Sequence, residues 1–413
     1  MSDTLRQPAL LETFAASTSK PLRRWVWLFA TVWLLWIATD WTCRCALFHW
    51  HRTWLPQKPA TTSISTPSYP ILRHIPEQHG AGLTSMIPVP WIRKQYEEYH
   101  PPRDEWVDAD GYPNAPLAEG ETWQAAVVGD SFMLSLGQKP FAEVLGEIGG
   151  IRVFTHARGA AGPFLELKKY VSDPPLSSPP PILIWSLTAR ELDSAFFLRQ
   201  PIDSWFAPRP AIPSAALTAS VRSVDWTRFA PETLSSALPQ TSLTAYFARK
   251  GWTAFRLLLF RTWPHDVLGA YDPQYGPILF YRENLRYFAK SNPAHAPAIA
   301  NVVAHVADRL CERGMALVVL LVPEKEQLHL AALPPDIGTA IAPSLDLLDA
   351  LAVELRARSV HVANPLPAFR TATASGTCLY WRDDTHWNDA GILLAAETVW
   401  KELNPILESL PRP

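Results

Sequence analysis

Short apolar runs alternate with amphipathic stretches along much of the chain. Patterns typical of buried strands occur at residues 126–128, 151–155, 182–187, 315–322 and 360–363. Helical patterns lie between them, near residues 140–148, 296–313 and 345–358, and a closing helix ends near residue 403. Strands that alternate with helices at this spacing predict a parallel sheet covered on both faces. We therefore expect an α/β fold, a three-layer α/β/α sandwich with a mostly parallel five-stranded sheet.

The apolar pattern near the N-terminus is of another kind. Residues 25–39 contain four tryptophans and no charge, and Asp40 is the first ionisable residue after them. At ~1.5 Å of rise per residue this run is somewhat short for a ~30 Å hydrocarbon core, but tryptophan tolerates the membrane interface. We expect one transmembrane anchor at residues 25–42, with residues 1–24 in the cytoplasm. A buried or an interfacial helix is the alternative.

Two further segments break the alternation. Residues 55–91 are rich in Pro, Ser and Thr and lack helical periodicity, so we expect a tether and lead-in at residues 43–120 and the main domain at residues 121–413. Residues 197–293 are dense in aromatic side chains, which predicts an inserted and partly helical cap with its best helix at 243–263. These aromatic residues suit either stacking on sugar rings or a small satellite core.

Composition excludes several classes of function. The 37 Lys and Arg residues against 39 Asp and Glu residues provide no basic field for nucleic acid. The four cysteines lack the spacing of a zinc or redox site, and we expect neither a metal nor a cofactor. Cys311 and Cys378 are expected to be small buried residues, although an oxidising compartment would permit a disulfide between them if they lay close together.

Candidate chemistry begins where the apolar run at 126–128 stops at Gly129, Asp130 and Ser131. Gly129 permits a sharp turn toward a following helix, which leaves Ser131 beside backbone N–H groups that can stabilise an anion. Asp and Ser are also ordinary helix caps, so this short motif needs partners. A serine hydroxyl requires a nearby base that a third group orients.

The partners are available at other strand ends, where ligands of such folds bind. His386 can serve as the base, and either Asp383 or Asp384 can accept its Nδ1–H. Backbone N–H groups of Ser131 and of Gly159 or Gly162 can form an oxyanion hole. Three further residues are placed to line the same site: Arg158, Thr188 and Arg190.

Several of these motifs resemble a known family. Gly129–Phe132 resembles the first block of SGNH/GDSL-type esterases, and Asp384–Trp387 resembles the D-T-H-W block of the alginate O-acetyltransferase SGNH-like group, AlgX and AlgJ. The segment Val322–Lys325 is similar to the Pro-x-Lys segment of that group. Tyr380, before the Asp/His loop, is also typical of the group. The order of the blocks is that of ordinary SGNH esterases, whose D-x-x-H spacing would select Asp383, and the third-block asparagine is not evident.

The resemblance implies a Ser-His-Asp enzyme that moves acetyl groups on or off a polysaccharide. Ser131 would be the nucleophile, His386 the base and Asp384 its orienter. It also implies a single-pass protein of the bacterial inner membrane with its catalytic domain in the periplasm and a membrane-bound O-acyltransferase as acyl donor. The alternatives are a polysaccharide or cell-wall O-acetyl esterase, and an inactive glycan-binding or scaffold subunit of a modification complex.

Overall fold

The computed structural model describes residues 27–40, 42, 71–80, 82–134, 138–159, 162–176, 178–207 and 243–410. The chain divides into two compact units, one formed by residues 1–62 and 214–255 and the other by residues 63–213 and 256–413. The second unit contains all of the strands described below.

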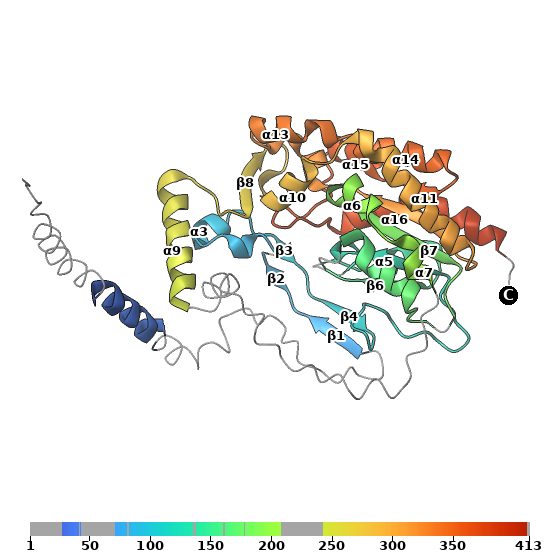
Figure 1. The fold of residues 1–413 in the computed structure, drawn as a ribbon, viewed down its shortest axis with the longest axis horizontal. Helices are drawn as coiled ribbons and strands as arrows, with labels where there is room; N and C mark the ends of the chain where they lie inside the picture. Colours follow the sequence, from blue (N-terminus) through green and yellow to red (C-terminus); the bar gives the residue numbers. More distant parts are fainter. Residues whose placement is uncertain are drawn as a thin grey trace, which may run out of the picture. The chain divides into compact units, whose positions relative to one another are not determined.

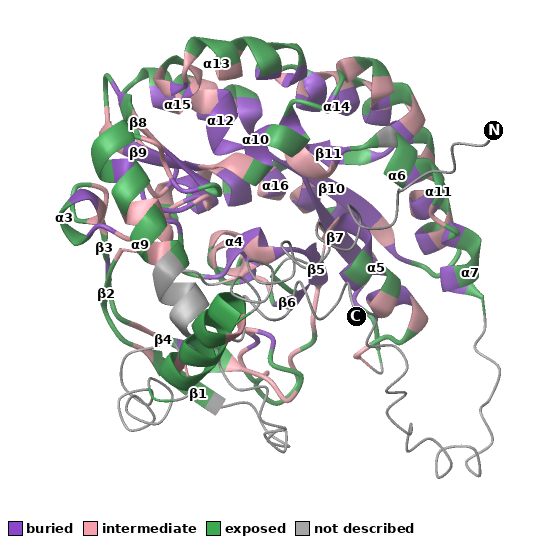
Figure 2. Ribbon diagram, turned by 60° about the vertical axis from the view of Figure 1, so that its left-hand side comes forward, coloured by how far each residue is buried: buried purple, intermediate pink, exposed green. Residues whose placement is uncertain are grey.

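The centre of the second unit is a five-stranded parallel sheet. Its strands are β5 (Ala125–Gly129), β6 (Val153–Ala157), β7 (Ile182–Thr188), β10 (Ala316–Val322) and β11 (His361–Ala363), in the order β11-β10-β7-β5-β6. Figure 2 shows β5, β7 and β10 as buried strands. The parallel pairing of these strands confirms the predicted sheet. Their near-continuous apolar runs are typical of strands buried on both faces.

Helices cover both faces of this sheet. On one face Val127 of β5 packs in a cluster with α4 (Phe141–Gly149) and α16 (Asp389–Ser409). On the other face Val128 belongs to a cluster with α5 (Gly162–Ser172), α11 (Ala296–Cys311) and α14 (Leu347–Ala357), of which α11 and α14 pack together (Figure 1). The three-layer sandwich follows directly from the alternation of side chains along each strand.

Residues 71–107 form local structure where the composition predicts a tether. Strands β1 (Ile71–Ile75) and β4 (Arg103–Val107) pair antiparallel, as do β2 (Gln78–His79) and β3 (Tyr99–His100). The turns between them hold η1 (Thr84–Met86) and α3 (Pro90–Arg93). Two-residue strands carry no periodic signal, which is why the sequence pattern does not reveal them.

The segment expected as an aromatic-rich insertion is of mixed structure. The helix predicted at 243–263 is confirmed as α9 (Leu243–Phe260). A hairpin of β8 (Val267–Asp272) and β9 (Gly276–Tyr281) follows it, and the sequence pattern did not predict this hairpin. The other described elements here are α6 (Ser194–Leu198), α7 (Ile202–Phe206) and α10 (Arg282–Phe288).

The remaining short elements connect the strands to the covering helices. They are η2 (Ser131–Met133), η3 (Ala189–Glu191), η6 (Pro293–His295), α12 (Lys325–Leu328), η7 (Leu330–Ala332), α13 (Pro335–Ile341), η8 (Ala342–Ser344) and α15 (Leu366–Ala374). Of these, η2, η3 and α12 follow the carboxyl ends of β5, β7 and β10, where the candidate site lies.

The N-terminal anchor and the cysteines differ from expectation. Residues 27–40 are helical, but among the described residues no helix is long and apolar enough to cross a membrane. The predicted anchor at 25–42 therefore has no support in the described part of the chain, and residues 1–24 lie outside it. Cys311, at the end of α11, is exposed rather than buried, Cys378 is half-buried, and both are free thiols.

Candidate active site

The turn after β5 presents Ser131. All five residues of β5 are buried, and a side chain at Gly129 would collide with the hydroxyl of Ser186 on β7. The Asp130 side chain caps η2 by accepting a hydrogen bond from the N–H of Phe132 at 3.0 Å. Ser131 is thus the first residue of a capped 3₁₀ turn at the carboxyl end of a central strand.

A second turn, between α15 and α16, presents the histidine. A bridge pairs Tyr380 with Trp387, and the N–H of Trp381 donates to the carbonyl of His386 at 3.1 Å. Asn388 then caps α16 by accepting from the N–H of Gly391 at 3.1 Å. The turn is therefore fixed at both ends, with His386 just before the last helix.

The two turns meet in one hydrogen-bonded chain. His386 Nε2 lies 2.8 Å from Ser131 Oγ, and its Nδ1 is bonded to Asp384 Oδ1. The backbone N–H of His386 also donates to Asp384 Oδ1, at 3.1 Å. Because an ionised carboxylate only accepts hydrogen bonds, Nδ1 carries the hydrogen and Nε2 is free to accept from the serine. This arrangement can withdraw a proton from Ser131.

Electrostatics favour the ionised form of Asp384. Burial by itself raises the pKa of this carboxyl, but the adjacent His386 and, to a smaller extent, Lys325 outweigh burial and lower the pKa to about 2. Asp384 is therefore a carboxylate at neutral pH, as the hydrogen bond to His386 Nδ1 requires.

The neighbouring carboxyl, Asp383, is bonded elsewhere. Its Oδ1 lies 3.2 Å from His100 Nε2, and its Oδ2 accepts from the backbone N–H of Glu98 at 3.0 Å. Asp383 is completely buried in this contact. The structure thus brings Asp384, and not Asp383, against His386.

The segment around β3 and strand β9 both contact the turn that carries Asp384 and His386. The carboxylate of Glu98 accepts from the backbone N–H and from Nε of Arg382, both at 2.6 Å. On β9, the N–H of Leu279 donates to the carbonyl of Arg382 at 2.8 Å. Gly82 lies so close to Asp384 that a Cβ there would collide with the carboxylate. Sequence reasoning missed Gly82, Glu98 and His100, and no local pattern marks them.

Of the residues expected at or near the oxyanion hole, Gly159 lies beside Ser131. A Cβ on Gly159 would lie 3.9 Å from Ser131 Cβ, so the backbone of Gly159 adjoins the serine. The Arg158 side chain is largely exposed and its Nε lies 3.8 Å from Glu166, on α5. Gly162 begins α5 with a φ of +67°, and no described contact joins it to Ser131.

Arg190 lies behind the serine turn. It donates to Glu324 at 3.1 Å, lies 3.7 Å from Asp130, and its guanidinium is 5.2 Å from the centre of the Phe132 ring. Burial raises the pKa of Glu324, and the charge of Arg190 opposes that rise. Thr188, at the end of β7, is buried, whereas 13% of the Arg190 side chain is exposed. Both residues lie at the same strand end beside the site.

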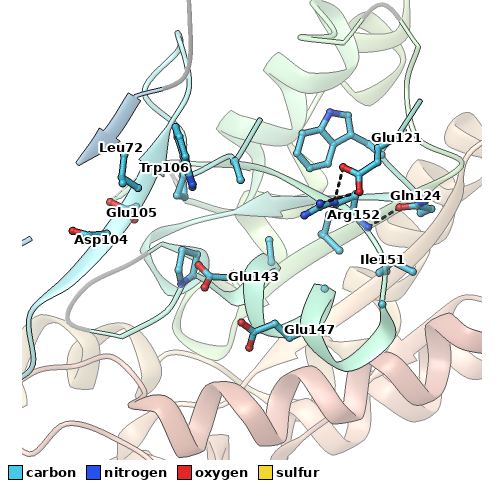
Figure 3. Close-up of a pocket in the computed structure, with 18 residues that line it drawn as sticks. Leu72, Asp104, Glu105, Trp106, Glu121, Gln124, Glu143, Glu147, Ile151 and Arg152 are labelled. Atoms are coloured by element: carbon cyan, nitrogen blue, oxygen red, sulfur yellow. Dashed lines mark hydrogen bonds and ion pairs between the residues drawn. The ribbon is translucent and has the colours of Figure 1, made fainter. Parts of the chain in front are cut away.

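A separate cavity of about 720 Å³ lies at the opposite ends of the strands. Figure 3 shows Trp106 on one side of it and the ion pair of Glu121 and Arg152 on the other, with Glu143 of α4 between them. Gln124 and Arg152, which line it, precede β5 and β6. Neither Ser131 nor His386 lines this cavity.

Comparison with solved structures finds distant similarity. One similar structure is a putative SGNH hydrolase from Slackia heliotrinireducens, with 16% identity and a TM-score of 0.29, and the match covers 68% of this chain and 100% of the other. Another is phospholipase A1 from Streptomyces albidoflavus NA297, with 13% identity and a TM-score of 0.36, and the match covers 68% of this chain and 98% of the other. TM-scores this low do not establish a shared fold. Among curated proteins, none matches significantly.

A family model described as "SGNH hydrolase-like domain, acetyltransferase AlgX" matches residues 279–412. The matched region contains β10, α12 and the turn with Asp384 and His386, whereas Ser131 precedes it. Residues 279–412 thus match the AlgX-type SGNH hydrolase-like domain, as the motifs around Lys325 and His386 predict.

Proposed function

We propose that this chain is a serine O-acetyltransferase of the SGNH type, in which Ser131, His386 and Asp384 act as the catalytic triad. The observation that carries the proposal is the hydrogen-bonded chain from Ser131 through His386 to a carboxylate that is ionised at neutral pH. The match of residues 279–412 to an acetyltransferase domain supports the acetyl group as the one transferred.

The reaction has two steps. Ser131 Oγ attacks the carbonyl of an acetyl ester while its proton passes to His386 Nε2, and Asp384 stabilises the imidazolium that forms. The oxyanion is held by the backbone N–H groups of Ser131 and Gly159. The tetrahedral intermediate collapses, the donor alcohol leaves with the proton from His386, and an acetyl-serine remains. An acceptor hydroxyl, deprotonated by His386, then takes the acetyl group and frees Ser131.

The nature of the acceptor distinguishes an acetyltransferase from an esterase. We infer that the acceptor is a hydroxyl of an extracytoplasmic polysaccharide and that a membrane-bound O-acyltransferase supplies the acetyl group, as the motif resemblance to the alginate O-acetyltransferase group implies. The match of residues 279–412 supports the transfer of acetyl. If water is the acceptor, the protein is an O-acetyl esterase. Mass spectrometry of products formed with an oligosaccharide acceptor distinguishes transfer from hydrolysis.

The decisive experiment uses the purified full chain with p-nitrophenyl acetate. Ser131→Ala and His386→Ala should each reduce kcat by a factor on the order of 10³ or more, because triad members act as one unit. A fluorophosphonate probe should label the wild type at Ser131 and leave Ser131→Ala unlabelled. Full activity of Ser131→Ala would refute the mechanism. Retained glycan binding without labelling of the wild type would instead indicate an inactive glycan-binding subunit.

A further inference from the structure

Lys325 is a buried cation whose ammonium lies among backbone carbonyls beside the site. The residue is 1% exposed, and it is the first residue of α12, three positions after the end of β10. The Nζ, with its three N–H groups, lies within hydrogen-bond distance of four backbone carbonyls: those of Trp381 at 2.7 Å, Leu279 at 2.8 Å, Asp384 at 2.9 Å and Arg382 at 3.1 Å. Three of the four acceptors belong to the turn that carries Asp384 and His386.

The remaining surroundings keep this amine charged and in place. The ammonium lies 5.6 Å from the centre of the Phe280 ring, and the charges of Glu326, Asp384 and Asp383 favour its protonated form. Burial lowers the pKa of Lys325 to about 8, so the cation remains the major form at neutral pH. A compact ammonium with rotatable donors suits several converging carbonyls, whereas the planar fork of arginine does not.

The adjacent residue connects the same helix to the serine turn. Glu324 caps α12 and accepts hydrogen bonds from the backbone N–H of Arg190 at 3.2 Å and from its guanidinium at 3.1 Å. Arg190 in turn lies 3.7 Å from Asp130, the residue before the serine. The start of α12 therefore contacts both turns, one through Glu324 and Arg190 and the other through Lys325.

We propose that Lys325 is a positioning residue for the reaction, and that its ammonium sets the conformation of the turn at residues 381–384 so that the Asp384 carboxylate faces His386. The inference rests on the proposed function, because it assigns Lys325 a task in the triad. Lys325 contacts neither Ser131 nor His386, so it acts through the backbone of the turn. Removing the ammonium takes this donor from the buried carbonyls of Leu279 and Asp384 and from the partly buried carbonyl of Trp381, whereas the Arg382 carbonyl keeps the N–H of Leu279. The turn must then rearrange to satisfy the carbonyls that lose their donor.

The test compares Lys325→Met and Lys325→Arg with the wild type in the full chain. The control is Lys290→Met, which removes an exposed lysine beside Tyr287. Two quantities are measured: kcat and KM with p-nitrophenyl acetate, and the far-downfield ¹H NMR resonance of a histidine Nδ1–H bonded to a carboxylate. We expect Lys325→Met to lower kcat by about 10²-fold with little change in KM, and to lose the resonance. Lys290→Met should change neither.

Lys325→Arg keeps the charge, but its planar guanidinium cannot reproduce the contacts of the ammonium with the four converging carbonyls, so we expect a reduced kcat and a shifted resonance. If Lys325→Met does not fold, the kcat and the resonance of Lys325→Arg test the positioning role of Lys325. A folded Lys325 variant with the kcat and the resonance of the wild type would overturn the inference. The resonance does not depend on turnover, so failure of this inference is distinct from failure of the proposed function, which the activity of Ser131→Ala tests.

Discussion

Asp383 and Asp384 are adjacent in the sequence but bind different partners. Asp384 accepts from the His386 side chain and backbone, whereas Asp383 contacts His100 and the backbone of Glu98. Both carboxyls are buried, so each depends on the hydrogen bonds of its own partners. The first serves the histidine and the second holds the turn against the segment around β3. Substitution of the two should therefore have different consequences.

Asp384→Asn should lower kcat by a factor on the order of 10⁴, because an amide no longer holds His386 in the tautomer that accepts from Ser131. Asp383→Asn should reduce the free energy of unfolding and affect kcat less, since the Asp383 carboxyl bonds to His100 and to the backbone of Glu98. Steady-state kinetics with p-nitrophenyl acetate and chemical unfolding of both variants check this. A larger loss of kcat in Asp383→Asn than in Asp384→Asn would contradict the assignment.

The lowered pKa of Asp384 also predicts a dependence of stability on pH. This pKa falls from an ordinary value of 3.8 to about 2 in the folded protein, so its stabilising effect is fully present above 3.8 and is lost as pH falls through about 2. The free energy of unfolding of the wild type relative to Asp384→Asn should therefore decrease by about 1 kcal/mol from pH 5 to pH 3. Urea unfolding at both values measures it, and a difference that stays constant would argue against the ion pair.

At the scale of elements, the two turns of the site are predictable to different degrees. The apolar pattern of β5 and the motif after it place Ser131 at a strand end, and the D-T-H-W motif places His386 before the last helix. By contrast, β2 and β3 have two residues each, and Glu98 meets Arg382 only because the chain folds back over 284 residues. Such contacts have no signal in local periodicity, since tertiary packing alone creates them.

Gly82 provides a test of this packing. In Gly82→Ala the new methyl group must displace the Asp384 carboxylate, so we expect kcat to fall by about 10²-fold with a modest change in melting temperature. Gly251→Ala is the matched control, because nothing lies within 4 Å of a Cβ at that position of α9. Kinetics and thermal unfolding of both variants decide the matter. Equal kcat values for the two would show that the turn tolerates the displacement.

At the scale of the whole molecule, the segment before the sheet belongs to the active unit. Residues 63–213 lie in the same unit as the site, and Glu98 and His100 bond to the turn with Asp384. A chain that begins at Ser63 should therefore retain its reaction with a fluorophosphonate, whereas one that begins at Arg103 should react at least about 10²-fold more slowly.

Labelling rates of the two truncated chains, with circular dichroism to verify folding, test this prediction. Rapid labelling of the chain that begins at Arg103 would show that residues 63–102 are dispensable.

The distance along the chain between Ser131 and His386 bears on how the protein is made. The two residues are 255 positions apart in the sequence. During synthesis the serine therefore emerges well before its base. A nascent or truncated chain that stops before His386 has no base for Ser131, so we expect it to be unreactive toward acyl donors.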